Sequence, residues 1–326
     1  MILDQFGRSI RYLRLSITDH CNFRCLYCMP EDIIFRKSSE LMQVDEILFF
    51  VRLFASLGFD KYRLTGGEPT LHPRLVELVN GISHTPGVER LAMTTNGVLL
   101  EALAKPLAQA GLQRVNISLD TIDPVKFRYL TRRGDIETVW RGIYAAEEAG
   151  LVPIKINMVV MDRYNLDEVV RLAALTREHP WQVRYIEMMP FDNTKNIQAD
   201  SIVTAAEIQA KVESEIGTLE VANAGELDGE ALLYKIPGAR GTLGFIASVS
   251  HPFCEDCDRA RLTADGRLRL CLLKDDELDL LTPLRSGASE DQIRQMILDG
   301  LYRKPKGHNL SEGELPENRG MSQIGG

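Results

Sequence analysis

Short apolar runs alternate with longer amphipathic segments over the first 190 residues of the chain. The short runs are rich in Val, Ile, Leu and Thr, as buried β-strands are, and the longer segments repeat apolar residues every three or four positions, as helices do. The predicted strands cover residues 10–18, 62–65, 90–95, 114–119, 153–160 and 183–188. The predicted helices cover residues 44–57, 73–82, 99–110, 124–149 and 166–178. This alternation predicts an α/β fold with a parallel sheet.

Six βα-like units can build either a partial barrel or a doubly wound sheet, and the pattern by itself does not distinguish the two. In both architectures ligands bind at the carboxyl ends of the parallel strands. Nearly all the notable polar residues of this chain fall at those ends. We therefore expect the site to lie at that edge of the sheet.

The regular alternation weakens after residue 190. The further predicted elements are helices at residues 205–215 and 291–301 and strands at residues 232–236, 245–249 and 267–272. We expect residues 1–190 to form the barrel and residues 191–303 to form a C-terminal region that caps it. Residues 304–326 are rich in Gly, Pro and polar side chains, which predicts a flexible tail.

The composition narrows the class of partner. The chain has 326 residues, of which 44% are hydrophobic and 26% are charged, as is ordinary for a globular protein. Its net charge of −8 argues against general nucleic-acid binding, although a local arginine cluster can still bind one anionic ligand. No apolar run approaches membrane-spanning length, and the N-terminal Met1-Ile2-Leu3-Asp4 has no signal character. We expect a cytoplasmic protein with no membrane or nucleic-acid partner.

The six cysteines form two groups of three, and the first group, Cys21, Cys25 and Cys28, lies in one short loop. Thiolates are soft ligands that select zinc, copper(I) or iron–sulfur clusters. A four-iron cluster with only three cysteine ligands has one open iron. The alternative is a structural zinc site completed by His20 or another residue. Zinc sites more often use pairs of cysteines two residues apart, so the spacing favours the cluster.

The second group consists of Cys254, Cys257 and, after thirteen intervening residues, Cys271. Taken alone, it slightly favours a zinc ribbon with His251 as a fourth ligand. A second cluster with an open iron is the other interpretation. Because the chain already carries one three-cysteine site, we favour the second cluster.

Polar and basic side chains recur on the predicted strands. Asn116, Ser118 and Asp120 share one face of their strand, where a packed core would have apolar residues, so we expect a ligand-holding interior. Further polar and basic residues on extended segments are Arg14, Arg63, Lys155, Asn157, Arg184, Arg259 and Arg261. Arginine forks match phosphate oxygens, so a ring of them suggests a polyphosphate ligand.

The orientation of two side chains, Lys155 and Met189, needs separate comment. Lys155 either meets an anionic partner inside the barrel or is a strand-end lysine that reaches solvent. Met189 differs from Arg184 by an odd number of positions, so a regular strand would not point both side chains inward. We therefore expect Met189 to lie beyond the end of the strand.

The first cysteine loop resembles that of the radical S-adenosylmethionine (SAM) enzymes, with the pattern Cys-x3-Cys-x2-Cys and an aromatic Tyr27 before the last cysteine. The resemblance implies a partial (β/α)6 barrel and an open iron that binds SAM. It also implies that the reduced cluster splits SAM and releases a 5'-deoxyadenosyl radical. Gly66-Gly67-Glu68-Pro69 matches the SAM-binding element of the family, although alone it reads as a tight turn after a strand.

The second cysteine triad, the Arg259–Arg261 pair after it and the C-terminal Gly325-Gly326 resemble the GTP 3',8-cyclases of molybdenum cofactor biosynthesis. The resemblance implies conversion of GTP to 3',8-cyclo-7,8-dihydro-GTP, the first step of that pathway. The deoxyadenosyl radical would take a hydrogen atom from ribose carbon 3', and the ribose radical would attack guanine carbon 8. The enzyme would be a lyase that consumes SAM and uses two 4Fe-4S clusters, with no side chain as acid or base.

The resemblance also implies roles for individual residues. The implied cluster ligands are Cys21, Cys25 and Cys28 for the first cluster and Cys254, Cys257 and Cys271 for the second. The implied SAM contacts are Tyr27, Gly67, Ser118 and Met189. The implied GTP contacts are Arg14, Arg63, Thr94, Lys155, Arg259, Ala260 and Arg261. Gly325-Gly326 would enter the active-site pocket, whereas its simpler interpretation is a frayed end.

The implied partners are GTP, an external electron donor and the downstream cyclic pyranopterin monophosphate synthase. The sequence leaves the oligomeric state open, a homodimer included. Two other functions stay open on the sequence alone. One is a radical SAM enzyme that modifies a peptide, and the other is a non-catalytic iron–sulfur sensor or zinc-stabilised module.

Overall fold

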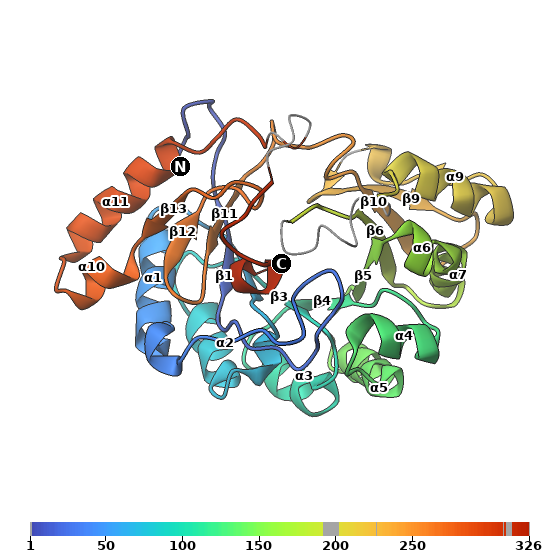
Figure 1. Ribbon diagram of the computed structural model, residues 1–326, viewed down its shortest axis with the longest axis horizontal. Coiled ribbons are helices and arrows are strands. Elements are labelled where there is room, and N and C mark those ends of the chain that lie inside the picture. The colour runs from blue at the N-terminus through green and yellow to red at the C-terminus, as the bar shows by residue number, and fades with distance from the viewer. Residues whose placement is uncertain (1, 192–201, 226, 309, 311–314, 326) are drawn as a thin grey trace.

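The computed structural model describes residues 2–191, 202–225, 227–308, 310 and 315–325 (Figure 1). These residues build one sheet of thirteen strands. Its six central strands are parallel neighbours in chain order: β1 (Tyr12–Ser16), β2 (Lys61–Thr65), β3 (Arg90–Thr95), β4 (Arg114–Ser118), β5 (Lys155–Val160) and β6 (Gln182–Glu187). The predicted α/β fold with a central parallel sheet is confirmed.

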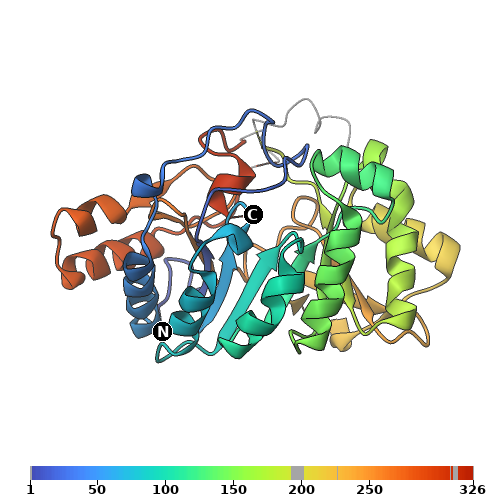
Figure 2. The same cartoon turned by 90° about the horizontal axis from the view of Figure 1, so that it is seen from below.

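The sheet forms a partial barrel. Its path runs from β13 (Glu277–Asp279) at one edge to β7 (Glu220–Val221) at the other, so it does not close on itself. The helices that connect the central strands lie outside the curved sheet in both views (Figures 1 and 2). The open, partial barrel is therefore the correct choice between the two architectures that the pattern left open.

The connections between central strands carry the outer helices. They are α1 (Val44–Ser56), α2 (Leu75–Ser83), α3 (Leu100–Gln109), α4 (Pro124–Thr131), α5 (Ile136–Glu148), α6 (Asp162–Asn165) and α7 (Val169–Glu178), with 3-10 turns at Ser38–Glu40, Pro69–Leu71 and Leu166–Glu168. In α1, Ile47, Phe50 and Phe54 recur at helical spacing and are fully buried in the main core. Burial of such a side chain contributes roughly 1.5–3 kcal/mol, which holds the helix on the sheet.

The predicted helical segment 124–149 is two helices, α4 and α5. The break begins at Arg132, whose backbone is left-handed with φ of 62°. The second helix then starts at a new N-cap, because the Asp135 carboxylate accepts a hydrogen bond from the backbone N–H of Glu137. A polar residue at this N-cap is thus the signal that separates the two helices.

The C-terminal region extends the same sheet at both edges. β10 (Thr242–Ile246) pairs in parallel with β6, and β11 (Arg259–Leu262) pairs in parallel with β1. The antiparallel strands β9 (Ala231–Lys235), β8 (Leu227–Asp228) and β12 (Arg267–Arg269) continue outward. The sequence predicts this region as a cap, and the structure adds that it covers both otherwise exposed edges of the barrel.

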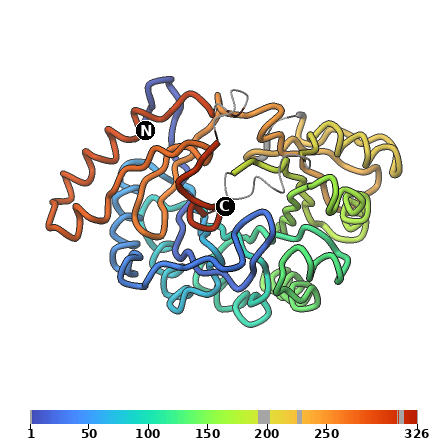
Figure 3. Tube along the Cα trace, viewed as in Figure 1, coloured from blue at the N-terminus to red at the C-terminus, as the bar shows by residue number. Residues whose placement is uncertain are grey.

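The remaining helices also belong to the C-terminal region. They are α9 (Ala205–Ile216), α10 (Leu281–Arg285), α11 (Glu290–Tyr302) and α12 (Met321–Ile324), with a 3-10 turn at Asn223–Gly225. α12 lies near the middle of the molecule, in front of the β1 side of the sheet (Figure 3). Among the described residues, no helix combines the length and apolar character that a membrane span requires.

Candidate functional site

A cavity of about 300 Å³ lies at the carboxyl ends of the parallel strands. Each of the eight parallel strands, β1 to β6, β10 and β11, contributes at least one side chain to its lining. The cavity is at the lower end of the ~300–1,000 Å³ typical of small-molecule sites. Ligands of parallel α/β sheets bind at this edge, so the cavity is the candidate functional site.

Most of the residues singled out from the sequence line this one cavity. They are Arg14, Cys21, Cys25, Tyr27, Cys28, Arg63, Gly67, Thr94, Ser118, Met189, Cys254, Cys257, Arg259, Arg261 and Cys271. Met189 lies beyond the end of β6, as its parity predicted. Residues far apart in the sequence therefore meet in one place.

Lys155 and Ala260 do not line the cavity. Ala260 lies between the two arginines of β11, so its side chain points to the opposite face, where it packs into the main core. Lys155 begins β5 two positions before Asn157, which does line the cavity, and its side chain is buried. The solvent-reaching interpretation of Lys155 is therefore wrong.

Hydrogen bonds to backbone atoms hold the first cysteine loop in place. The Arg24 guanidinium donates to the carbonyl oxygens of Cys21 (2.8 Å) and Phe23 (2.7 Å) and lies over the Phe35 ring. The backbone N–H of Arg24 donates to the carbonyl of Thr131 at the end of α4. These contacts fix the loop without using any thiol.

Burial makes the three thiols difficult to ionise on their own. It raises the pKa of Cys21 to about 11 and that of Cys28 to about 12, and it raises the pKa of Cys25 further. A cationic metal centre reverses this effect, because a coordinating thiol is deprotonated. The three free cysteines thus suit a metal centre as donors.

The described residues form no compact site for a single metal ion. Zinc with ~2.3 Å bonds to sulfur requires its ligands to converge on one point. Among the described residues, no three His, Cys, Asp or Glu side chains gather closely enough to hold one metal ion. His20 stacks on Phe35 and faces Asp19, and His251 is exposed.

Two glycines after β2 allow its carboxyl end to pack closely against the segment that leads into the cysteine loop. A Cβ on Gly66 would lie 2.3 Å from the Thr18 carbonyl oxygen, and one on Gly67 would lie 2.3 Å from that of His20. Backbone hydrogen bonds join Gly67 to Thr18 (2.9 Å) and Glu68 to His20 (2.7 Å). Only glycine permits this approach, so the turn places the β2 end directly beside the cysteines.

The Glu68 carboxylate, next to that turn, binds the end of β3. It is buried and accepts hydrogen bonds from the Thr95 hydroxyl (2.7 Å) and the Asn96 backbone N–H (2.7 Å). Burial raises its pKa, and these hydrogen bonds oppose the shift. The Asn96 amide then donates to the Asn22 side chain (2.7 Å), which ties the β3 end to the cysteine loop.

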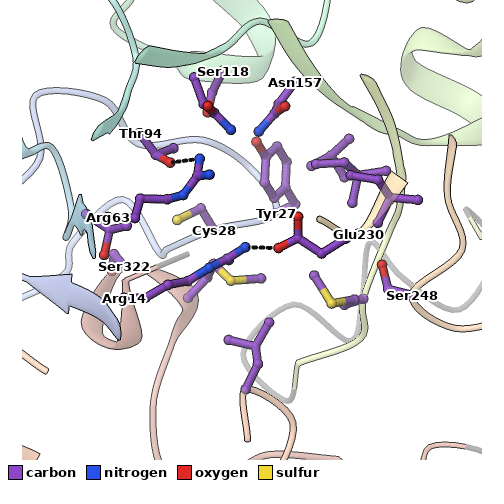
Figure 4. Close-up of a pocket in the computed structure, with 18 of the residues that line it drawn as sticks. Arg14, Tyr27, Cys28, Arg63, Thr94, Ser118, Asn157, Glu230, Ser248 and Ser322 are labelled. Atoms are coloured by element: carbon purple, nitrogen blue, oxygen red, sulfur yellow. Dashed lines mark hydrogen bonds and ion pairs between the residues drawn. The ribbon is translucent and has the colours of Figure 1, made fainter. Parts of the chain in front are cut away.

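Unsatisfied polar atoms lie across the cavity from the cysteines. The side-chain oxygens of Asn116 and Asn157 are buried without a hydrogen-bond partner, and both residues line the cavity. Tyr27 donates a hydrogen bond to Asp120 (2.9 Å), and Figure 4 shows its ring beside Asn157. Buried polar groups normally have partners, so these orphaned oxygens indicate a place for a polar ligand.

Register explains why the arginines converge. Arg14 on β1 lies opposite Arg63 on β2 and opposite Arg261 on β11. On the other side of the cavity, Arg184 on β6 lies opposite Asn157 on β5. Residues in register on neighbouring strands point to the same face, so the sheet directs all four of these cations into the cavity.

A carboxylate that the sequence analysis missed lies among these arginines. Glu230 contacts Arg14, Arg184 and Arg259, and Figure 4 shows it pointing at Arg14. Burial raises its pKa, but the surrounding arginines overcome burial and hold the pKa well below its ordinary value. The sequence around Glu230 has little regular alternation of apolar and polar residues, so no element was predicted there. The preceding Asp228-Gly229 is a hairpin-turn signal that could have located it.

The positive charges of neighbouring arginines repel one another in this part of the cavity. Burial, together with the neighbouring Arg14 and Arg259, holds the pKa of the Arg261 guanidinium well below its ordinary value. Arg63 donates to Thr94 (3.5 Å) and to the Tyr12 hydroxyl. A polyanion in this part of the cavity would relieve the repulsion among the cations.

The second cysteine triad lies at the same end of the cavity. Cys254 and Cys257 precede β11 and Cys271 follows β12. Burial raises the pKa of Cys257, but Arg259 and Lys304 more than offset it and bring the pKa to about 7. A thiol with a lowered pKa at a cationic site is a better metal ligand, so this triad also fits a metal centre.

The described end of the predicted flexible tail packs into the site. Ile324 of α12 is buried, and the Gly325 carbonyl accepts a hydrogen bond from Arg261 (2.9 Å). Gly325 has φ of 71°, and a Cβ there would lie 2.2 Å from the Thr65 hydroxyl. Gly326 lies outside the described residues. The tail therefore reaches the arginines through Gly325.

Two family models match consecutive parts of the chain. The Radical SAM superfamily model matches residues 15–176, and the Molybdenum Cofactor Synthesis C model matches residues 181–310. The chain is 44% identical over 324 residues to the GTP 3',8-cyclase of Pelotomaculum thermopropionicum, covering 99% of both chains. It is also 44% identical over 326 residues to the GTP 3',8-cyclase of Gloeobacter violaceus, covering 98% of this chain and 99% of the other.

Solved structures share the fold at low sequence identity. The crystal structure of SuiB from Streptococcus suis bound to the precursor peptide SuiA superposes with a TM-score of 0.65 at 13% identity. That similarity covers 98% of this chain and 77% of SuiB. HydG, a maturase of the FeFe-hydrogenase, superposes with a TM-score of 0.51 at 18% identity over 64% of this chain and 50% of that chain.

Proposed function

The chain belongs to the GTP 3',8-cyclases, a family of radical SAM enzymes, and we propose a role for each group of cavity residues in that reaction. The reaction converts GTP to 3',8-cyclo-7,8-dihydro-GTP in the first step of molybdenum cofactor biosynthesis. When bound, a reduced 4Fe-4S cluster and SAM supply the radical that takes hydrogen from ribose carbon 3' before that carbon bonds to guanine carbon 8. The observation that carries the proposal is the convergence of two cysteine triads and an arginine cluster on one cavity.

Cys21, Cys25 and Cys28 would hold the cluster that the radical SAM family requires. The loop containing them is fixed by backbone hydrogen bonds, which leaves the thiols available as ligands. We assign contacts with SAM to the cavity residues Tyr27, Gly67, Ser118 and Met189. The orphaned Asn157 oxygen in the same area supports a polar ligand there.

The arginines would hold the triphosphate of GTP. We assign this role to Arg14, Arg63, Arg259 and Arg261, because guanidinium forks bind phosphate oxygens in pairs of hydrogen bonds. Fixing the triphosphate fixes the position of the ribose, so the chain's contribution to the rate is largely orientation. After carbon 3' bonds to guanine carbon 8, one electron, which the external donor would supply, and one proton from solvent would complete the 7,8-dihydro product, and we assign no side chain as acid or base.

We assign three further residues, Thr94, Ala260 and Lys155, to the GTP end of the cavity. Thr94 lines the cavity and already accepts a hydrogen bond from Arg63. Ala260 would act through its backbone, because its side chain faces the core. Lys155 is buried beneath the lining and would attract the triphosphate through its charge.

Cys254, Cys257 and Cys271 would hold a second 4Fe-4S cluster. Their support is the donor set of three cavity-lining thiols, together with the lowered pKa of Cys257. The open iron of such a cluster would bind the edge of the guanine base. Triphosphate and base would then be held at two separate points, which would leave the ribose facing the SAM end.

The reaction also implies partners outside the cavity. An external electron donor would reduce the clusters, and a cyclic pyranopterin monophosphate synthase would consume the product. We place the reaction in the cytoplasm, where thiols stay reduced. A homodimer is our proposal for the assembly.

An anaerobic assay tests this function. Reconstituted protein, SAM and a reductant are incubated with GTP, and 5'-deoxyadenosine is quantified. Its release should depend on GTP, and guanosine should not replace GTP, because guanosine lacks the groups that the arginines bind. Release that never depends on GTP would show that the substrate assignment is wrong.

A further inference from the structure

The Glu230 carboxylate occupies the centre of the arginine cluster. Its Oε1 contacts Arg14 and Arg259, and its Oε2 lies 3.2 Å from Nη2 of Arg184. Its side chain is 10% exposed, and those of the three arginines are 14%, 15% and 3% exposed. In Figure 4 it reaches toward Arg14 across the cavity. One anion therefore joins guanidinium groups from β1, β6 and β11.

The contacts of Glu230 are those that a phosphate group would make. A carboxylate presents two oxygens to guanidinium forks, and a phosphate presents three in a similar arrangement. Arg63 is a fourth cation close enough to stabilise the charge of Glu230. A phosphate group carries more charge and more acceptor oxygens than a carboxylate, so it can replace Glu230 on these guanidinium groups.

The backbone beside Glu230 has open space on one side, at Gly229. Glu230 and Gly229 form the turn between β8 and β9, where Asp228 pairs with Ala231. Gly229 has φ of 70°, and a Cβ there would meet no atom within 4 Å. The tip of this hairpin thus has open space beside it, while β9 remains paired with β10.

We propose that Glu230 is a positioning residue that keeps Arg14, Arg184 and Arg259 converged in the ligand-free enzyme and gives up these contacts to the triphosphate. The proposal rests on the assignment of these arginines to GTP in the proposed function. Glu230 and the triphosphate compete for the same guanidinium groups. The hairpin tip withdraws as the phosphates enter.

This competition predicts opposite effects on stability and on affinity. Removing the charge of Glu230 takes one carboxylate partner from each of these buried arginines in the ligand-free protein, and the loss of a partner of a buried charge is destabilising. It also removes the group that a polyphosphate must displace. A purely structural Glu230 would instead lose affinity when neutralised, because the disordered arginines would bind phosphate less well.

The test compares wild-type and Glu230→Gln holoenzyme in binding inorganic tripolyphosphate, with guanosine as the control ligand. We expect tripolyphosphate to bind the variant roughly tenfold more tightly, a gain of ~1.4 kcal/mol, because it no longer displaces a charged hydrogen-bond partner of the arginines. Guanosine binding should be unchanged. Affinity for tripolyphosphate that is equal or weaker in the variant, or absent in both proteins, overturns the proposal.

Thermal unfolding gives a second readout on the same proteins. Without ligand the Gln variant should unfold at a lower temperature than the wild type, and saturating tripolyphosphate should remove most of the difference, because the ligand stabilises the variant more. A difference that persists in full under saturation contradicts the proposal.

If Glu230→Gln fails to fold, Glu230→Asp replaces it in the binding test. Aspartate keeps the charge but is too short to reach all three arginines, so it should bind tripolyphosphate more tightly than wild type by a smaller factor. Equal or weaker binding overturns the proposal. GTP-dependent release of 5'-deoxyadenosine by the wild type is measured separately, so loss of this proposal leaves the proposed function standing.

Discussion

Arg14 on β1 lies directly opposite Arg261 on β11, in the register of two neighbouring parallel strands. The two residues come from opposite ends of the chain, and the pairing brings the C-terminal cysteines and the tail to the barrel. Neither the barrel nor the C-terminal region alone contains both cysteine triads. The site is thus assembled by the pairing of β1 with β11.

Replacing Arg261 with lysine tests the arginine cluster. Arg261 is buried and donates to the Gly325 carbonyl, and a single ammonium group cannot reproduce the two-pronged geometry of guanidinium. Arg261→Lys should therefore weaken GTP binding by roughly tenfold, a loss of ~1.4 kcal/mol. Calorimetry on protein with matched iron content measures the change.

Arg11→Lys is the matched control for this substitution. Arg11 pairs with Asp60 at the surface, and its side chain is 45% exposed. Surface pairs contribute ~0–1 kcal/mol, so this variant should bind GTP as the wild type does. Equal GTP affinity in wild type and Arg261→Lys would remove Arg261 from the site.

Gly325→Ala tests the docking of the tail. The added Cβ would collide with the Thr65 hydroxyl, and the left-handed backbone disfavours alanine in any case. We expect turnover to fall severalfold while iron content stays unchanged. Gly287→Ala has the same backbone strain at φ of 89° without any atom within 4 Å, so it controls for strain. Deletion of Gly325-Gly326 should match Gly325→Ala, and unaffected turnover in both would show that the tail has no role.

The Asp265–Arg319 ion pair should make the docked tail sensitive to pH. Asp265 accepts two hydrogen bonds from the Arg319 guanidinium, at 2.9 and 2.8 Å, shortly before α12. Burial raises the pKa of Asp265, but Arg319 and Thr263 more than offset it, so the folded pKa lies below the ordinary 3.8. The pair is therefore stabilising above that pH and is lost as the pH falls through the lower, folded pKa.

Asp265→Asn mimics the acidic condition at neutral pH. Protease cleavage within the tail should become faster in this variant, and its rate should change less than that of the wild type as the pH falls below 4, because Asp265 no longer titrates while Glu277 still pairs with Arg319. Asp291→Asn, at a side chain that is 97% exposed, is the control. If Asp265→Asn and wild type are cleaved at the same rate at pH 7, the ion pair does not hold the tail.

Iron content tests the second triad. Cys271→Ala should lower the iron bound by the reconstituted protein from about eight to about four per chain, because one of two four-iron clusters loses a ligand. His251→Ala should leave iron unchanged, since His251 is exposed. Zinc bound in place of the second four irons would instead support a zinc site.

The sequence predicted the barrel well because its signals are local. Each central strand is a short run of apolar or alternating residues, so β1 to β6 were all located from periodicity. The short cysteine loop and the glycine turn after β2 are also local patterns. These features were enough to locate the end of the cavity that we assign to SAM.

The end of the cavity that we assign to GTP is formed by contacts between distant parts of the chain, which the periodicity of the sequence does not reveal. β11 is only Arg259–Leu262, and nothing in those four residues indicates that they pair with β1. Glu230 acquires its role only when strands from three parts of the chain converge on it. The docking of Gly325 likewise depends on a steric fit against Thr65.

The fate of the hydrogen on ribose carbon 3' tests the central claim most directly. Wild-type holoenzyme is incubated with SAM, a reductant and GTP deuterated at carbon 3', and the 5'-deoxyadenosine is examined by mass spectrometry. The account predicts one deuterium in 5'-deoxyadenosine and none after deuteration at carbon 2'. Unlabelled 5'-deoxyadenosine from the 3'-deuterated GTP, formed together with product, would contradict it.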